Sequence, residues 1–241
     1  GKLTSIDTSA ALAAPGVHGV FTAKDVPGEN LWGPILHTEP LFAEKQVECV
    51  GQVVAIVVAE TEAQATQASH LVELEIESMD PVLSIKDGIE AGDFLYGPHT
   101  IERGDLAAAF EAADFVIEHE VSSPGQDHFY LESQAALVIP EEDGTFLVLS
   151  STQHPTEIQH VVSSTLNIPN NRGVCSVPRL GGGFGGKESQ ASPFAAYAAL
   201  AAYKTGRACK AWLHRHQDMS WTGNRHPFYS SYRAAFNEAG M

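Results

Sequence analysis

The stretch "PRLGGGFGGKES", residues 178–189, has glycine at five of the six positions 181–186. Glycine is used where the backbone must adopt a positive φ or lie very close to another group. The loop therefore either lines a ligand site or makes a tight turn against a neighbouring strand. Phe184, inserted between the glycines, fits a core plug or the wall of a cleft better than it fits a simple turn.

The residues on either side of this loop predict a strand before it and a helix after it. "RGVCSVP" (172–178) is typical of a strand, and the alanine-rich residues 189–206 predict a helix that Gly206 ends. Pro193 fits the first turn of that helix, where its missing N–H costs nothing. A glycine loop leading into a helix N-terminus presents bare N–H groups to an acceptor such as a phosphate, an oxo group or a carbonyl.

Two nucleotide-binding interpretations of the loop are weak. From Gly181 to Glu188 the sequence has the form G-x-x-x-x-G-K-E, whereas a P-loop needs Ser or Thr after the lysine to bind Mg²⁺. A carboxylate at that position would instead repel the phosphates. Gly181, Gly183 and Gly186 also match G-x-G-x-x-G, but the loop lies late in the chain, and no acidic residue follows near position 208, where a dinucleotide fold needs one.

Composition limits the function classes. The chain has 241 residues, 30 of them acidic and 14 basic, with a formal net charge of −16. This charge argues against nucleic acid and anionic membranes as partners. A basic, aromatic segment after residue 206 favours an internal site or a subunit contact over a nucleic-acid surface. Its basic residues are Arg207, Lys210, Arg215, Arg225 and Arg233.

The cysteines and the apolar runs indicate a cytoplasmic location. Cys49, Cys175 and Cys209 form no CxxC motif, and an odd number leaves one unpaired, as suits a reducing compartment. The longest apolar runs are far shorter than the roughly 20 residues that a membrane span requires. The chain opens with "GKLTSID" and stops soon after a predicted strand, so we expect it to be a piece of a longer polypeptide.

The first part of the chain alternates short strands and helices. Residues 17–23 and 49–59 predict strands, the second of them buried, and 72–78 alternates like a half-buried strand. A helix follows Thr8 or Ser9, and another begins at Thr61, where Gln64 completes a capping box. Residues 79–100 are rich in Gly and Pro and lack periodicity, so the domain boundary is placed there, with domains at 1–87 and 95–241.

The second part predicts an α+β fold. An Asp-capped helix runs from "GDLAAAF" into an alternating strand, and strands at 135–140 and 145–151 are joined by a hairpin turn in which Gly144 supplies the positive φ. Residues 156–167 form a predicted helix with one apolar stripe. Strands and helices without a regular βαβ rhythm favour α+β in two parts over a doubly wound sheet. The members of the stripe are Ile158, Val161, Val162 and Leu166.

Several motifs in combination resemble one known family. "GGGFGGKE" is similar to the signature loop of the molybdenum hydroxylases, the xanthine dehydrogenase and aldehyde oxidase family. "GQDHFYLE" (125–132), "STQ" (151–153) and "TGNRHPF" (222–228) occur in that family's order and spacing. The first part resembles its α/β-hammerhead domain, and residues 95–241 resemble the N-terminal part of its mixed-sheet molybdopterin-binding domain. Within the family, the "IERGDL" and "GQDHFYLE" stretches are most similar to xanthine dehydrogenases.

The resemblance implies a chemistry and a set of site residues. The family hydroxylates a carbon flanked by nitrogen in a heterocycle at a molybdenum centre held by a pterin dithiolene, with water as the oxygen source. Gln153 matches the glutamine whose amide contacts an oxygen of that centre. Phe184 and Gly185 match the loop position that approaches it, the glycine offering its backbone N–H and the phenyl ring forming a wall of the pocket. Glu188 matches the glutamate that binds the purine in xanthine dehydrogenases, where aldehyde oxidases have an apolar residue. A helix-capping role for Gln153 and a helix N-terminal role for Glu188 are the structural alternatives.

Parts of the family's machinery are expected outside this chain. The catalytic base, a substrate-binding arginine and most pterin contacts lie downstream of Met241 by resemblance, so no catalytic residue is assigned here and the isolated chain is expected to be inactive. Iron–sulfur clusters need cysteine ligands, so they and FAD are expected on other segments or subunits of an oligomeric assembly. A relative acting on aldehydes or other azaheterocycles, and a non-catalytic docking fragment, remain alternatives.

His214 and His216 form the one pair that suggests a direct metal site. On a strand they would share a face, but no third ligand is evident, so packed or solvated histidines are favoured. By resemblance the molybdenum has no direct protein ligand in this chain.

Overall fold

The computed structural model describes all 241 residues as two compact units. The first unit combines Gly1–Met79 with Asp127–Gly223, and the second combines Asp80–Gln126 with Asn224–Met241. Both units contain strands and helices, so the predicted α+β class is confirmed. The helices are α1 (Ser9–Leu12), α2 (Glu62–Ser69), α5 (Pro155–Leu166), α6 (Ser192–Thr205) and α7 (Arg215–Trp221) in the first unit, and α3 (Ile85–Ala91) and α4 (Leu106–Glu111) in the second.

The N-terminal residues of the first unit form three two-stranded antiparallel sheets, pairing β1 with β6, β2 with β5, and β3 with β4. Helix α2 packs on β5. It begins at the predicted capping box, because Thr61 accepts the N–H of Gln64 while the Gln64 side chain accepts the N–H of Thr61. The strands are β1 (Lys2–Asp7), β2 (Val17–Thr22), β3 (Leu31–Trp32), β4 (Glu39–Pro40), β5 (Ala55–Ala59) and β6 (Glu73–Glu77).

The larger sheet of the first unit has four strands in the order β10-β9-β8-β11. Strand β10 is parallel to β9, and the other neighbours are antiparallel, so the sheet is mixed as expected. Gly144 has φ +81° in the β8–β9 turn, as predicted. The strands are β8 (Ala135–Pro140), β9 (Phe146–Ser150), β10 (Gly173–Ser176) and β11 (Cys209–Trp212).

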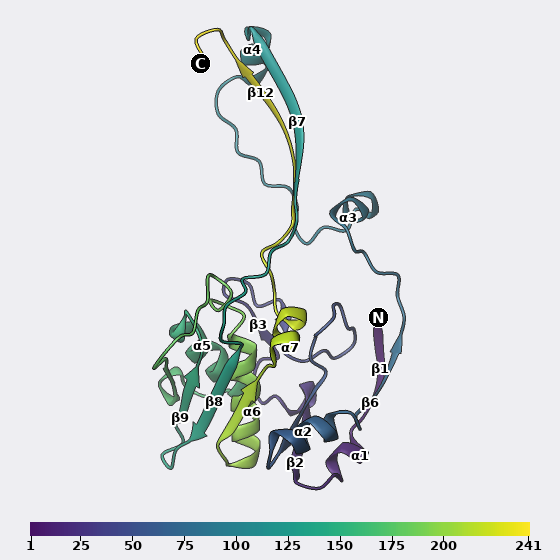
Figure 1. Cartoon of the computed structure of the whole chain (residues 1–241), viewed down its shortest axis with the longest axis vertical. Coiled ribbons are helices and arrows are strands. Elements are labelled where there is room, and N and C mark those ends of the chain that lie inside the picture. Colours follow the sequence, from purple (N-terminus) through teal and green to yellow (C-terminus); the bar gives the residue numbers. More distant parts are fainter. The chain divides into compact units, whose positions relative to one another are not determined.

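Helices α5 and α6 pack against this sheet, and its main hydrophobic core lies between the two layers (Figure 1). Alternation along β8 and β9 supplies that core, since Ala136, Val138 and Val148 are buried. Ile158, Val162 and Leu166 of the predicted apolar stripe of α5 are buried with them, and Val161 is buried in a second core. The glycine loop leaves the sheet after β10 and enters α6, as the sequence predicted.

A second core joins the N-terminal residues to the helices of the large sheet. Trp32, Leu41 and Phe42 pack against Tyr197 and Leu200 of α6. The Tyr197 hydroxyl donates to the Leu41 carbonyl at 2.6 Å, and burial raises the pKa of that hydroxyl far above its ordinary value. The first unit is therefore one compact body built from two separate stretches of sequence. Compact units defined by contacts differ from family domains, so the domain boundary placed between residues 87 and 95 stays a prediction.

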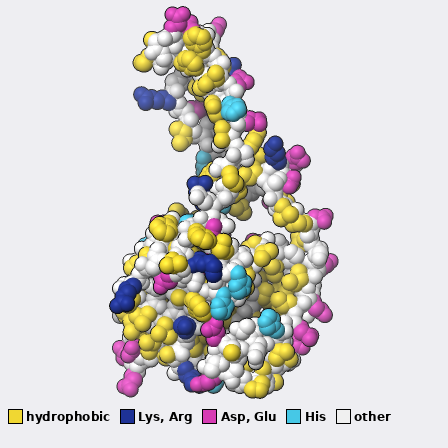
Figure 2. Space-filling model, viewed as in Figure 1, with side chains coloured by type: hydrophobic (Ala, Val, Ile, Leu, Met, Phe, Trp, Pro, Cys, Tyr) yellow, Lys and Arg dark blue, Asp and Glu magenta, His cyan; other side chains and the backbone are white.

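The second unit is built on a two-stranded antiparallel ribbon. Strand β7 (Phe115–Ser123) pairs with β12 (Phe228–Phe236) over nine residues, and α4, capped by Asp105 as predicted, precedes it. Many apolar side chains of this unit are exposed, and Figure 2 shows hydrophobic side chains along its surface. Two strands alone cannot bury both faces of a ribbon, which explains the exposure. No helix of the chain has the length and apolar character of a membrane span.

Two local predictions were wrong. The expected buried strand at 49–59 exists only as β5, which is half-buried because α2 covers just one face. Strand β6 is exposed along its whole length, since its only strand partner is β1. The strand arrangement considered for His214 and His216 does not occur, because β11 ends at Trp212 and His214 is the N-cap of α7.

Candidate functional site

The glycine loop, residues 181–188, makes a sharp turn at positions 184–187 between β10 and α6. Gly182 and Gly185 have φ of +96° and +92°, which only glycine adopts without strain. Phe184 has φ +54° and is 75% exposed. A bulky residue in the left-handed region costs free energy, and such strain is often stored at functional sites.

Two of the remaining glycines, Gly181 and Gly186, are required by a neighbouring segment of the same chain. A Cβ on Gly186 would lie 2.7 Å from ring atoms of both His128 and Tyr130. A Cβ on Gly181 would lie 2.5 Å from the Cβ of Glu132. Residues 128–132 thus run beside the loop at backbone contact distance. The tight packing considered in the sequence and an exposed ligand-facing surface are both present, on opposite sides of one loop.

Lys187 points away from solvent and into the protein. Its ammonium is fully buried and donates to Ser151 Oγ at 2.6 Å, to Glu132 Oε2 at 3.3 Å and to the Ser133 carbonyl at 3.4 Å. It also lies 4.6 Å from the centre of the Tyr130 ring, within cation–π range. All three donors are used inside the chain, so this lysine has none left for a nucleotide phosphate.

Burial and pairing act in opposite directions on this ion pair. Burial lowers the pKa of Lys187, and the charge of Glu132 only partly offsets that effect. Partial burial alone would raise the pKa of Glu132. Hydrogen bonds from Ser151 and the Gly181 N–H, together with the charge of Lys187, hold it below the ordinary value of 4.5. The carboxylate is therefore ionised at neutral pH and binds the loop backbone and the lysine together.

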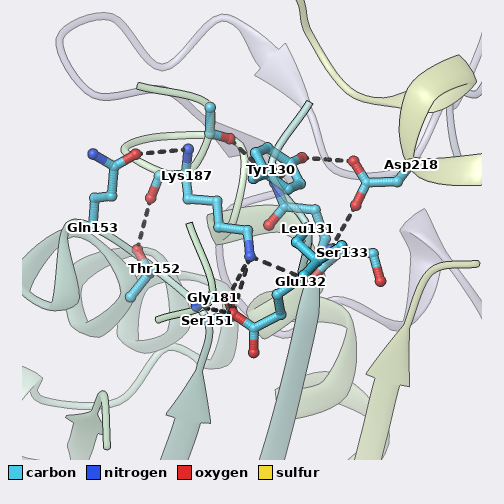
Figure 3. Close-up of polar contacts among 12 residues, drawn as sticks. Tyr130, Leu131, Glu132, Ser133, Ser151, Thr152, Gln153, Gly181, Lys187 and Asp218 are labelled. Carbon is cyan, nitrogen blue, oxygen red and sulfur yellow. Dashed lines mark hydrogen bonds and ion pairs between the residues drawn. The ribbon is translucent and has the colours of Figure 1, made fainter. Parts of the chain in front are cut away.

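Gln153 follows β9 and binds the loop through its own backbone and side chain (Figure 3). Its N–H donates to the Lys187 carbonyl at 2.8 Å. Its Oε1 accepts the N–H of Gly185 at 2.9 Å and that of Lys187 at 3.3 Å. These two donors assign the amide orientation and direct Nε2 away from the loop backbone. Gly183 lies directly against this side chain, so any larger residue there would displace it.

The structure matches neither of the structural alternatives, which were helix capping by Gln153 and a helix N-terminal position for Glu188. Helix α5 has His154 as its N-cap with no side-chain cap, and Gln153 binds the loop instead. Glu188 is exposed and precedes Ala191, the N-cap of α6, so it lies outside the first turn of that helix. Gly185 is exposed, but its N–H already donates to Gln153.

The structure therefore places three of the four predicted residues on the glycine loop and the fourth, Gln153, directly against it. Gln153 contacts Gly185 directly, Phe184 precedes Gly185, and Glu188 follows the buried Lys187. All four are exposed, so they are accessible to a ligand.

A buried polar network behind residues 130–134 was not found from the sequence. Asp218 on α7 accepts the Tyr130 hydroxyl and the Gln134 N–H, each at 2.6 Å (Figure 3). Arg215 on the same helix donates to the carbonyls of Tyr130 and Leu131. Burial, together with the hydrogen bond to Asp218, strongly raises the pKa of the Tyr130 hydroxyl. The motif "GQDHFYLE" pointed to this segment, but its partners lie more than eighty residues away.

The histidine pair has structural partners. His214 Nε2 lies 3.0 Å from Glu62 Oε1, and its ring stacks on that of His216 with centres 6.0 Å apart. No group of three or more His, Cys, Asp or Glu side chains in the chain is arranged to hold a metal ion. The cysteines Cys49, Cys175 and Cys209 are all free thiols.

Models of two protein families match the chain and define its class. Residues 1–80 match the "aldehyde oxidase and xanthine dehydrogenase, a/b hammerhead domain", and residues 90–241 match the "molybdopterin cofactor-binding domain". The second match covers more than half of the chain. The fold is thus a hammerhead domain followed by a molybdopterin-binding region. The chain belongs to the xanthine dehydrogenase and aldehyde oxidase family of molybdenum hydroxylases.

Curated relatives come from both branches of the family. The chain is 45% identical to aldehyde oxidase 2 of Cavia porcellus over 241 residues, which is 99% of this chain and 18% of that protein. It is 43% identical to xanthine dehydrogenase of Drosophila subobscura, covering 100% of this chain and again 18% of the relative. The chain thus spans less than one fifth of the length of these relatives.

Solved structures share the fold. The aldehyde oxidoreductase of Desulfovibrio desulfuricans superposes with a TM-score of 0.88 at 26% identity, covering 99% of this chain and 28% of that one. CO dehydrogenase of Oligotropha carboxidovorans gives a TM-score of 0.85 at 25% identity, covering 99% of this chain and 33% of that one. The shared architecture confirms the predicted sequence of a hammerhead domain and a mixed-sheet molybdopterin-binding region.

Proposed function

We propose that the chain is part of the molybdenum subunit of a xanthine dehydrogenase-like enzyme that hydroxylates purines with water as the oxygen source. In this proposal residues 1–87 are the hammerhead domain and 95–241 begin the molybdopterin-binding domain. The observation that carries it is that Glu188 on the glycine loop and Gln153, which binds that loop, are both exposed. One side chain is a fixed amide donor suited to the cofactor, and the other is a carboxylate suited to a purine.

The residues present fit a molybdopterin-type cofactor. The Nε2 of Gln153 is directed away from the backbone, and a neutral amide donor suits an electronegative oxygen. Phe184 presents an exposed ring, and a Cβ added at Gly185 would have no neighbour closer than 3.9 Å, so a ligand has room beside the backbone there. When bound, the cofactor supplies the two-electron oxidation of the substrate carbon. The chain's own part is to hold and orient the cofactor and the substrate.

Glu188 is the proposed substrate-orienting residue. Its side chain is exposed, so the carboxylate is accessible to a ligand. A carboxylate accepts hydrogen bonds readily, and a purine ring presents N–H donors along its edge. An ionised acceptor fixes such a ring more strongly than a neutral one. An apolar residue at this position would favour substrates without such donors.

The remaining machinery is proposed to lie on other segments or subunits. Transfer of electrons from the reduced cofactor requires iron–sulfur clusters and FAD, and cluster ligation needs groups of cysteines. Cys49, Cys175 and Cys209 lie apart in the sequence and do not form such a group. The catalytic base is likewise proposed downstream, so the chain alone should show no turnover.

The test uses the complete protein with its iron–sulfur and flavin partners. Hypoxanthine and xanthine turnover is measured for the parent, for Glu188→Ala and Gln153→Ala, and for the control Glu142→Ala in the exposed β8–β9 turn. Losing a hydrogen bond to a charged group should reduce kcat/KM for purines roughly tenfold or more in Glu188→Ala. Unchanged purine turnover in that variant would remove Glu188 from the substrate site.

A related activity on aldehydes or other azaheterocycles is the second candidate. It is favoured by the aldehyde oxidase relatives, which are as similar to this chain as the xanthine dehydrogenases are. Profiling the complete protein with purines, aromatic aldehydes and nicotinate separates the two. Preferential oxidation of aldehydes, with Glu188→Ala having no effect on it, would select the second candidate.

A further inference from the structure

Lys187 binds two different segments beside the glycine loop at once. Its backbone carbonyl accepts the N–H of Gln153 at 2.8 Å and the hydroxyl of Thr152 at 3.0 Å, and its own N–H donates to Gln153 Oε1. Its side chain runs the opposite way and ends between Ser151 and Glu132 (Figure 3). One residue thus connects the loop backbone, the end of β9 and the segment that runs beside the loop.

We propose that Lys187 is a positioning residue for Gln153, holding the loop backbone so that the Gln153 amide keeps its Nε2 directed outward. Two N–H groups set that orientation, those of Gly185 and of Lys187 itself. Both depend on where the Lys187 backbone lies, and the buried ammonium fixes that place. This inference rests on the proposed function in one respect only, the identity of the ligand group that the Gln153 amide contacts.

A charge is better suited to this task than an apolar side chain would be. An apolar residue of the same length would fill the space but would bind neither Glu132 nor Ser151. A buried ammonium without partners is strongly disfavoured, so the lysine is stable only in the one position where Ser151, Glu132 and the Ser133 carbonyl receive it. Glycines offer the loop almost no side-chain contacts of their own. The pair therefore supplies the specificity of position that the loop sequence lacks.

The first experiment reads the position of the loop without any cofactor. In the 241-residue chain, amide hydrogen exchange is measured for Gly185 in the parent and in Lys187→Met. We expect Gly185 to exchange at least roughly tenfold faster in the variant, because its acceptor is no longer held. The amides of Val162 in α5 and Ala199 in α6 should keep their protection.

Two further variants keep this test decisive. Ser151→Ala removes the 2.6 Å contact to the ammonium with a smaller change, and it replaces Lys187→Met if that variant does not fold. Lys210→Met is the matched control, since this lysine is exposed on β11 and its ammonium lies 5.5 Å from the centre of the Trp212 ring instead of binding Glu132 or Ser151. The proposal is overturned if the Gly185 amide exchanges at the parent rate in Lys187→Met, or in Ser151→Ala where that variant must replace it. It is also overturned if Lys210→Met accelerates Gly185 exchange as much as Lys187→Met does.

The second experiment asks whether Lys187 acts through Gln153. In the complete protein carrying molybdopterin, kcat and KM are measured for Lys187→Met, Gln153→Ala and the double variant. We expect Lys187→Met to lower kcat roughly tenfold with KM within about twofold, and the double variant to be no slower than Gln153→Ala alone. Multiplied losses in the double variant would show that Lys187 acts by another route and would refute the positioning role.

The two readouts separate this inference from the proposed function. If the complete protein hydroxylates no substrate, the proposed function fails, and Gly185 exchange alone decides the position of the loop. If the protein is active but Gly185 exchange does not respond to Lys187→Met, the function stands and the positioning role is lost.

Discussion

Replacing Gly186 with alanine tests whether the loop is shaped by the segment beside it. The new Cβ would lie 2.7 Å from His128 Cγ and 2.7 Å from Tyr130 Cε1, where real contacts are about 1 Å longer. The Tyr130 ring cannot move aside freely, because its hydroxyl donates to the buried Asp218 at 2.6 Å. Overpacking of this kind costs about 1–3 kcal/mol, and loss of the tyrosine hydrogen bond would add about 1.5 kcal/mol or more.

We therefore expect Gly186→Ala to lower the free energy of unfolding by about 3 kcal/mol. For a chain of this size that corresponds to a fall in Tm of roughly 6–12 °C. Circular dichroism melts and urea titrations measure both quantities on the 241-residue chain.

Gly206→Ala is the matched control for this experiment. Gly206 has φ +65° at the end of α6, and a Cβ there would have no neighbour within 4 Å. Alanine at 206 thus introduces left-handed backbone strain of about 1 kcal/mol and no collision. If Gly186→Ala destabilises the chain no more than Gly206→Ala does, the packing explanation for the loop glycines is wrong.

Three more outcomes follow from buried and titrating groups. Asp218→Asn should lower the free energy of unfolding by about 2–3 kcal/mol, because the new NH₂ group would face either the Tyr130 hydroxyl or the Gln134 N–H, which are both donors. The control Glu142→Gln should leave Tm unchanged in the same melts. Burial raises the pKa of Cys175 to about 11, and partial burial with the nearby Glu39 and Glu48 also raises the pKa of Cys49. Because Cys49 is exposed and Cys175 is not, iodoacetamide at pH 8 should label Cys49 faster than Cys175, and the rate at Cys175 should still rise above pH 9; equal rates at pH 8 would contradict this. The pKa of Glu132 is held below 4.5, so its carboxylate stabilises the fold above that pH, and the contribution is lost as pH falls through the lowered pKa. Glu132→Gln should therefore flatten the dependence of Tm on pH between about pH 5 and 3, and an unaltered slope would refute the assignment.

Local signals in the sequence predicted much of the fold. The capping box at Thr61, the turn glycine at 144 and the apolar stripe of α5 all depend on residues within one or two turns of each other. Such features are fixed by backbone geometry and nearby hydrogen bonds, so a single sequence is sufficient to find them.

Features that depend on distant partners were missed. Strand β6 alternates like a half-buried strand, yet its neighbourhood leaves both faces exposed. Helix α7 was not predicted, although its Asp218 and Arg215 bind residues 130–134. The short polar sequence "HRHQDM" has little helical periodicity, and its stability comes from these long-range hydrogen bonds.

The same distinction applies to the candidate site. Resemblance located Gln153, Phe184, Gly185 and Glu188, and the structure places the last three on the exposed loop with Gln153 bound against it. It did not reveal that the Gly185 N–H is already donated to Gln153, because that bond depends on the path of the loop. The role of each residue toward a cofactor or a substrate stays a prediction.

The glycine loop is exposed yet ordered because buried residues beneath it bind its backbone. A run of glycines has high conformational entropy when unfolded and few side-chain contacts when folded, so it would not hold a fixed shape by itself. Here Lys187 resembles a phosphate-binding lysine in sequence but turns inward to Glu132 and Ser151. The ammonium satisfies groups of its own chain, and the outer surface is left to the Gln153 amide and to Phe184. A ligand that binds this surface meets groups already in place, so less of its binding free energy is spent on ordering the loop.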